Sequence, residues 1–198
     1  MPNPMMRRNR SFALTKRASN CSQANPRPHR GGSRPIAKED YEYKRAGTRN
    51  LFVAVEPKAG RRQVEVTDRR TKSDFVAFVQ RLALETYGRA RKIHLALDNL
   101  NTHFRASFEE VMGLEAAAVF LSRLEFHYTP KHARWLNMAE IEIGILDRQC
   151  TGRRIGDETR LRSEALAWEQ QRNQEGRRID WKFTRQDADR KLSRHYVT

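Results

Sequence analysis

A short apolar run that ends abruptly on a carboxylate constrains the fold more than any other stretch. The residues from Ile93 to Leu97 are apolar except for His94, and Asp98 follows directly, with polar residues after it. A run of this length predicts a buried strand that delivers Asp98 to its carboxyl end. In open α/β sheets, ligands bind at that edge. Asp is also common in turns and at helix caps, so the strand alone does not decide the role of Asp98.

The other expected elements surround this strand with further strands and helices. Two strands around a tight turn, over residues 51–56 and 63–67, predict a hairpin. Helical spacing of apolar residues predicts helices over 73–88 (capped by Ser73), 107–124 (broken at Gly113), 136–150, 161–172 and 185–195, and a short strand over 125–129. This order predicts an α/β fold in which a mixed sheet has helices on both faces. A strand that should pair beside the hairpin is not evident upstream, so we expect the first strand to be missing.

The positive charge of the chain is concentrated at its start. The net charge is +15, and residues 1–38 hold nine Lys or Arg and no Asp or Glu, whereas residues 39–150 hold eighteen basic and sixteen acidic residues. A segment rich in Pro, Arg and Ser cannot bury enough apolar surface to fold. We therefore predict a disordered basic leader over 1–38 and a folded domain over 39–198. The charge favours a polyanionic partner, with nucleic acid as the first candidate.

Cysteine usage and hydropathy exclude several classes of protein. Cys21 and Cys150 are the only cysteines and are far apart, which excludes a Cys-based zinc site and a disulfide framework. No apolar run reaches membrane-spanning length, and the N-terminal region lacks the apolar segment of a secretory signal. We expect a cytoplasmic protein with no membrane partner.

A second acidic candidate lies downstream of Asp98. Glu140 falls in the first turns of the predicted helix over 136–150, and the segment between the two acids is long enough for a helix and a strand. Both carboxylates can then meet at the carboxyl edge of the sheet, as oxygen ligands for Mg²⁺ or Mn²⁺. Two such ions support phosphodiester chemistry. The pattern alone equally fits Glu140 and Glu142 as solvent-facing residues of an amphipathic helix.

Three motifs resemble one known family. They are Leu97-Asp98-Asn99-Leu100-Asn101-Thr102-His103, Phe126-His127-Tyr128-Thr129-Pro130-Lys131-His132 and Trp135-Leu136-Asn137-Met138-Ala139-Glu140. From about residue 41 to 196, the chain resembles the catalytic domain of bacterial insertion-sequence transposases related to the mariner superfamily. The resemblance implies a ribonuclease H-like fold, an Asp-Asp-Glu triad and Mg²⁺ or Mn²⁺ as cofactor. It also implies transposon ends and target DNA as partners, with a homodimer or full-length transposase as a protein partner.

The resemblance also assigns roles to individual residues. Asp98 matches the second Asp of the triad, and Glu140 matches the triad Glu, so both are expected to be catalytic metal ligands. Glu142 is the runner-up, because the Glu-Ile-Glu run leaves the alignment open. His103 is expected to orient Asp98, to contact DNA phosphate or to cap a helix. Three residues of the loop before Glu140 are expected to bind the DNA backbone, or else to be solvated: Lys131, His132 and Arg134.

The chain departs from the family pattern at its start. The family's first Asp lies on a strand before the hairpin, whereas residues 1–38 contain no Asp, and Asp40 lies too close to the hairpin. The helix-turn-helix region expected at the N-terminus is missing too. We therefore expect an N-terminally truncated and inactive transposase domain, associated with the bacterial nucleoid. Two alternatives stay open: a non-catalytic DNA-binding or dimerising regulator of full-length transposase, and a basic RNA-associated protein.

Overall fold

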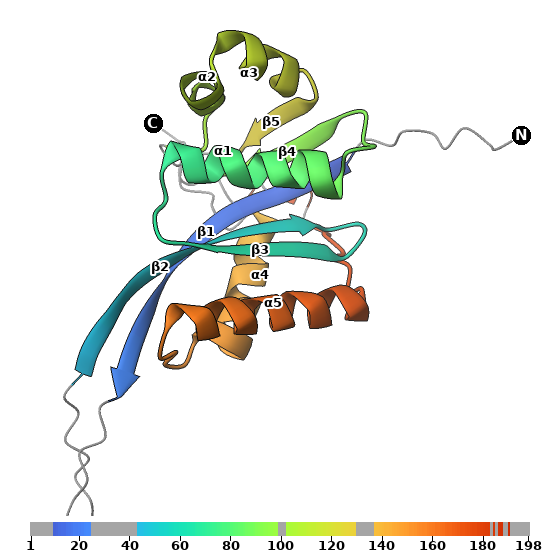
Figure 1. The fold of residues 1–198 in the computed structure, drawn as a ribbon. Helices are drawn as coiled ribbons and strands as arrows, with labels where there is room; N and C mark the ends of the chain where they lie inside the picture. Colours follow the sequence, from blue (N-terminus) through green and yellow to red (C-terminus); the bar gives the residue numbers. More distant parts are fainter. Residues whose placement is uncertain are drawn as a thin grey trace, which may run out of the picture.

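A single five-stranded sheet with helices on both faces forms the core of the computed structural model (Figure 1). The structure describes residues 10–24, 43–98, 102–129, 137–182, 184, 186–187 and 190. The strand order is β3-β2-β1-β4-β5. The strands are β1 (Arg10–Ala24), β2 (Tyr43–Glu56), β3 (Arg61–Thr67), β4 (Ile93–Leu97) and β5 (Leu124–Tyr128). The predicted mixed sheet with helices on both faces is confirmed.

The central strand, β1, comes from the segment expected to have no secondary structure. The expectation that the first strand is missing is therefore wrong. β1 pairs in parallel with β4 over Arg10–Leu14 and antiparallel with β2 over Ala13–Ala24, so it joins the hairpin to the rest of the sheet. These pairings use backbone N–H and C=O groups, which every residue in β1 carries, so a weakly apolar strand can occupy this position. The rest of the predicted leader, over 1–9 and 25–38, lies outside the described residues.

One face of the sheet is covered by α1 (Lys72–Arg81), α2 (Ala106–Met112) and α3 (Leu114–Leu121). These helices pack on an apolar cluster that includes alternate residues of β4, and five members match the predicted helical spacing: Phe75, Val76, Val79, Leu82 and Ala83. The expected break at Gly113 is confirmed, with φ at 82°. The expected cap at Ser73 is wrong. Thr71 and Asp74 form a reciprocal capping box that begins α1 two residues earlier.

The other face is covered by α4 (Met138–Leu146), a π-helical turn (Asp147–Thr151) and α5 (Glu158–Glu175). Apolar spacing in the predicted helix over 161–172 places three residues on its inward side, and all three are buried in the cluster on this face: Leu161, Ala165 and Trp168. The predicted helix over 185–195 lies mostly outside the described residues. None of the described helices is long and apolar enough to cross a lipid bilayer.

In the predicted helix over 136–150, apolar spacing puts Met138, Ile141 and Ile145 on one stripe, but the buried face of α4 consists of other residues. Its buried residues are Ala139, Glu142, Ile143 and Leu146, while Ile141 is 43% exposed. These four positions have regular helical spacing, but one of them is a glutamate. A pattern of apolar residues alone cannot reveal a helix face that contains a buried charge.

Candidate functional site

Asp98 lies at the carboxyl end of β4, as predicted, and its side chain is buried. The residue is only 2% exposed, and β4 pairs in parallel with β1 on one side and β5 on the other. The backbone N–H of Thr129 donates to the carbonyl of Leu97 over 2.9 Å, which ties the end of β5 to the end of β4. Asp98 therefore follows directly from a fixed backbone position where β4 and β5 both end.

The buried side chain of His103 is hydrogen-bonded to the carboxylate of Asp98. The Nδ1 atom of His103 lies 2.7 Å from Oδ1 of Asp98, and the ring is 1% exposed. That ring stacks on Phe75 with 4.6 Å between centroids, and the hydroxyl of Tyr128 donates to the His103 carbonyl. Burial raises the pKa of this Tyr128 hydroxyl, which keeps it a hydrogen-bond donor. The enclosed position favours the orienting role of His103 over a contact with DNA phosphate, and Arg105 occupies the cap position of α2 instead.

The bond between Asp98 and His103 fixes both groups. A buried carboxylate needs hydrogen-bond donors in place of water, and an imidazole N–H supplies one here. With Nδ1 directed at Asp98, the Nε2 atom of His103 is buried and has no hydrogen-bond partner among the described residues. The carboxylate of Asp98 is thus preorganised, and its orientation depends on the imidazole of His103.

Glu140 occupies the first turn of α4, as predicted. The side-chain oxygen of Asn137 accepts the N–H of Ala139 and begins the helix at this point. The helix contacts β1 and β2. Ala139 belongs to the same apolar cluster as Ala96, which lies two residues before Asp98. The start of α4 and the end of β4 therefore border one cluster on the same face of the sheet.

Glu142, the runner-up to Glu140, is held by two buried arginines. Its Oε1 lies 2.7 Å from Nη2 of Arg62 and 3.1 Å from Nη2 of Arg172. The three residues are 1%, 3% and 6% exposed, respectively. They join α4, β3 and α5 in one ion-paired group. Because two guanidinium groups already neutralise this carboxylate, the arrangement favours Glu140 as the second candidate ligand.

The third acidic position of the family pattern has no acid in β1. Leu14 of β1 pairs with Leu97 of β4, so Thr15 is at the register position beside Asp98. The sequence of β1 contains no Asp or Glu. Within the described ranges, the one carboxylate that follows directly from the end of a strand at this edge is Asp98, and Glu140 stays a candidate from the first turn of α4. Among the described residues, β1 therefore adds no carboxylate ligand beside Asp98.

Several predicted residues lie outside the described ranges. They are the DNA-contacting candidates Lys131, His132 and Arg134, together with Asn99, Leu100 and Asn101 of the first motif. The roles given to them stay predictions.

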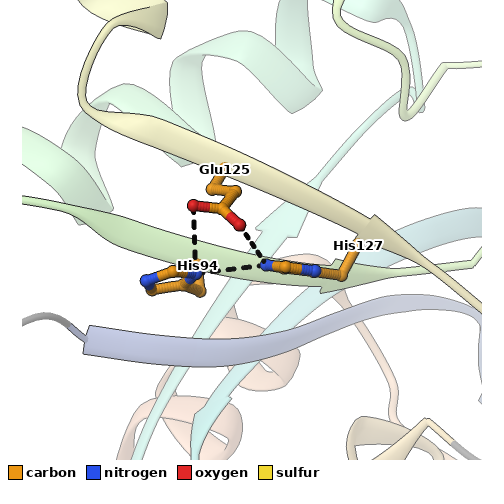
Figure 2. A group of neighbouring side chains, drawn as sticks. All are labelled: His94, Glu125 and His127. Atoms are coloured by element: carbon orange, nitrogen blue, oxygen red, sulfur yellow. Dashed lines mark hydrogen bonds and ion pairs between the residues drawn. The ribbon is translucent and has the colours of Figure 1, made fainter.

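A second polar group, which the sequence analysis did not identify, lies on the two outer parallel strands. Figure 2 shows His94 of β4 facing Glu125 and His127 of β5. The available signal was the register of two adjacent strands, since His94 pairs with Glu125 and Ala96 pairs with His127. The register between two strands cannot be derived from a single sequence.

Comparison with protein families identifies the chain. Residues 18–162, most of the chain, match the DDE superfamily endonuclease model. The chain belongs to this family. The family resemblance predicted from the three motifs is therefore confirmed for this DDE superfamily domain. No curated protein sequence matches it significantly.

Two solved structures share the fold of this DDE superfamily domain. A pre-cleavage Mos1 transpososome matches with a TM-score of 0.51 and 9% identity, over 85% of this chain and 55% of that chain. The Mos1 transposase paired-end complex with left transposon end matches with a TM-score of 0.51 and 10% identity, over 87% of this chain and 52% of that chain. The chain thus spans about half the length of these structures. The likeness confirms the expected ribonuclease H-like fold.

Proposed function

We propose that this chain is a transposase-type DNA cleavage and joining domain centred on Asp98 and Glu140, in a form that lacks one acid and is inactive. The observation that carries the proposal is the buried Asp98–His103 pair at the carboxyl end of β4, within a fold and family whose members are endonucleases. The basic RNA-associated alternative receives no support from the family match.

Each residue of the proposed site has a distinct role. Asp98 and Glu140 bind the divalent cation, Mg²⁺ or Mn²⁺, through carboxylate oxygens. When bound, such a cation activates water or a 3′-hydroxyl for attack on a phosphodiester. His103 is a positioning residue, because it touches Asp98 and is itself buried. Glu142 is structural, since its charge is paired with Arg62 and Arg172.

The proposed inactivity follows from the register of β1. Thr15 is at the position beside Asp98 where an acid would join the other two, and a threonine hydroxyl is a weak ligand for a hard cation. A nicking assay on supercoiled DNA tests this directly. In Mg²⁺ or Mn²⁺ we expect no cleavage by the parent protein and measurable cleavage by Thr15→Asp. That cleavage should vanish in the double variant Thr15→Asp, Asp98→Ala.

A matched control places the new acid elsewhere on the same strand. Ser19→Asp adds the same charge to β1 at a position that pairs with Arg49 and should leave the protein inactive. Cleavage by the parent protein that disappears in Asp98→Ala would show that another acid completes the site. A folded Thr15→Asp variant that binds Mn²⁺ no better than the parent would show that the register assignment is wrong.

We also infer that DNA is the main partner, bound through basic residues such as Lys131, His132 and Arg134 and through the basic N-terminal segment. Mos1 forms a paired-end complex with transposon DNA, which supports DNA ends and a second transposase subunit as partners here. Binding to chromosomal DNA would place the protein in the bacterial nucleoid.

Salt dependence tests the contribution of the N-terminal segment. Deletion of residues 1–38 is unsuitable, because it removes β1. Replacing Arg27, Arg30 and Arg34 by Ser should reduce the slope of log K against log salt by about 0.9 for each lost phosphate contact, or about 2.7 in all. Three exposed arginines serve as the control set: Arg89, Arg177 and Arg178. An equal reduction of the salt slope in both sets of variants would show that the N-terminal segment does not contact DNA more than other exposed arginines do.

A regulator of full-length transposase is the second candidate function. The absence of an acid from β1 favours it, because the fold and the DNA-binding charge are retained without the full set of ligands. When mixed with an active transposase relative, this protein should lower DNA cleavage by that relative. The Asp98→Ala variant of this protein should lower it equally. A regulator role is wrong if mixing leaves cleavage unchanged.

A further inference from the structure

We propose that His94, Glu125 and His127 form a binding site for one zinc-like divalent cation on the β4–β5 half of the sheet. His94 projects from β4, and Glu125 and His127 project from β5 (Figure 2). His94 pairs in register with Glu125, and Ala96 pairs with His127, so all three side chains are on the same sheet face. Two adjacent strands therefore present three donors to one point.

The distances between the donor atoms suit a single metal ion. The Nδ1 atom of His94 lies 3.1 Å from Nε2 of His127, and the Glu125 oxygens lie 3.5 Å and 3.4 Å from these two nitrogens. Zn²⁺ with ligand bonds of 2.0–2.1 Å in a tetrahedron separates its donors by about 3.3 Å. Both contacts to Glu125 are longer than a good hydrogen bond, which is about 2.7–3.2 Å. The two histidine nitrogens are within hydrogen-bond distance of each other, and all three donor atoms lie close enough to share one ion.

The types of donor select the class of cation. Imidazole nitrogens suit Zn²⁺, Co²⁺ and Ni²⁺, whereas Mg²⁺ prefers an all-oxygen shell. Two histidines and one glutamate are an established ligand set for zinc with an open fourth position. The side chains of Glu125 and His127 are 47% and 51% exposed, so a cation can reach them and water can complete the shell.

The proposed zinc site is separate from the Asp98 site. His94 precedes Asp98 by four residues, which in a strand places the two about 13 Å apart. α4 contacts β1 and β2 and α5 contacts β3, whereas the side chains of His94, Glu125 and His127 are 25%, 47% and 51% exposed. A cation here would link β5, an edge strand, to β4. Since the hydroxyl of Tyr128 supports the backbone of His103, that link would also steady the strand beside Asp98.

Zinc binding by the purified chain tests the site without any assay of cleavage. We expect one Zn²⁺ per chain by calorimetry, with a higher unfolding temperature in Zn²⁺ and visible absorption from bound Co²⁺. His127→Gln and Glu125→Gln should each weaken Zn²⁺ binding by at least about 10-fold, since even loss of a group that only supports a ligand costs that much. Excess Mg²⁺ should not displace the Zn²⁺.

Matched variants separate this site from other sources of metal binding. His29→Gln and Glu115→Gln remove the same groups elsewhere and should leave Zn²⁺ affinity unchanged, as should Asp98→Asn. The proposal is overturned if the parent binds no stoichiometric Zn²⁺, or if His127→Gln, still folded by circular dichroism, binds it as tightly as the parent. Loss of Zn²⁺ binding in Asp98→Asn alone would assign the ion to the Asp98 site instead.

Discussion

Asp98 and Glu142 are buried to nearly the same degree, yet their surroundings give them different tasks. Glu142 has two guanidinium groups within 3.1 Å of one oxygen, whereas Asp98 has an imidazole at 2.7 Å. An acid paired with two arginines has its charge compensated inside the protein. An acid held by one imidazole keeps its orientation and can still bind a cation. The comparison shows that burial alone does not separate a candidate metal ligand from a structural carboxylate, because the two differ in the charge of their partners.

The largest expected effect comes from removing the acid between the arginines. Glu142→Gln leaves Arg62 and Arg172 buried without a counter-charge, which should reduce the free energy of unfolding by about 3–5 kcal/mol. Urea denaturation followed by circular dichroism measures this. Glu140→Gln, two residues away and more exposed, is the matched control and should change stability by less than about 1 kcal/mol.

A triple variant tests whether the loss comes from unpaired charge. Arg62→Met, Glu142→Leu and Arg172→Met together remove all three charges and keep most of the volume, so stability should return close to that of the parent. If Glu142→Gln is no less stable than Glu140→Gln, the two arginines do not depend on Glu142. Glu142 would then become a candidate metal ligand again.

A smaller effect on stability and a larger effect on metal binding are expected at Asp98. Asn at this position still accepts a hydrogen bond from His103, so Asp98→Asn should lower the free energy of unfolding by only about 1–2 kcal/mol. Its loss of charge should abolish Mn²⁺ binding, measured by calorimetry. The exposed Asp180→Asn is the control and should change neither quantity. Mn²⁺ binding that survives Asp98→Asn would contradict the assignment of this carboxylate as a ligand.

Glu169 of α5 sharpens the comparison, because among the described residues it has a backbone N–H partner and no ion pair. Its Oε2 accepts the backbone N–H of Val64 over 2.7 Å, and burial raises the pKa of its carboxyl above the usual 4.5. A raised pKa in the folded state means that protonated Glu169 is favoured, so the folded state loses stability as pH rises from about 4.5 through the raised pKa.

Glu169→Gln should remove this part of the pH dependence. Gln keeps an oxygen for the Val64 N–H and cannot ionise, so the variant should become more stable relative to the parent as pH rises through that interval, by less than about 1 kcal/mol. Thermal unfolding at a series of pH values measures the difference. An equal difference at every pH would show that ionisation of Glu169 does not influence stability. Exposed Glu115→Gln is the control.

Local sequence patterns predicted the strand that ends at Asp98, the inward face of α5 and the first turn that carries Glu140. Each depends on residues close together in the chain, where apolar spacing and capping groups are visible. Glu142 is different, because the arginines that explain its burial are 80 and 30 residues away. The group of His94, Glu125 and His127 was missed for the same reason, since it exists only once two strands are in register.

β1 was not predicted because the composition of its segment did not indicate a strand. Pro, Arg and Ser are frequent around it, and its apolar run is confined to Phe12, Ala13 and Leu14. Its position depends on backbone pairing with β2 and β4, which sequence periodicity does not show. The family's first acid was expected on a strand before the hairpin. β1 lies before the hairpin, and its sequence contains no Asp or Glu.

The central place of β1 also affects the order in which the chain can fold during synthesis. β1 can pair with β2 soon after residue 56 is made, but its other partner, β4, begins only at Ile93. At roughly 5–20 residues per second, Ile93 at the start of β4 follows Ala24 at the end of β1 by about 3–14 s. Throughout that interval one edge of the middle strand is unpaired, and such an edge can recruit strands from other chains. Completing the sheet is therefore a late, long-range step, during which the growing polypeptide is most exposed to aggregation.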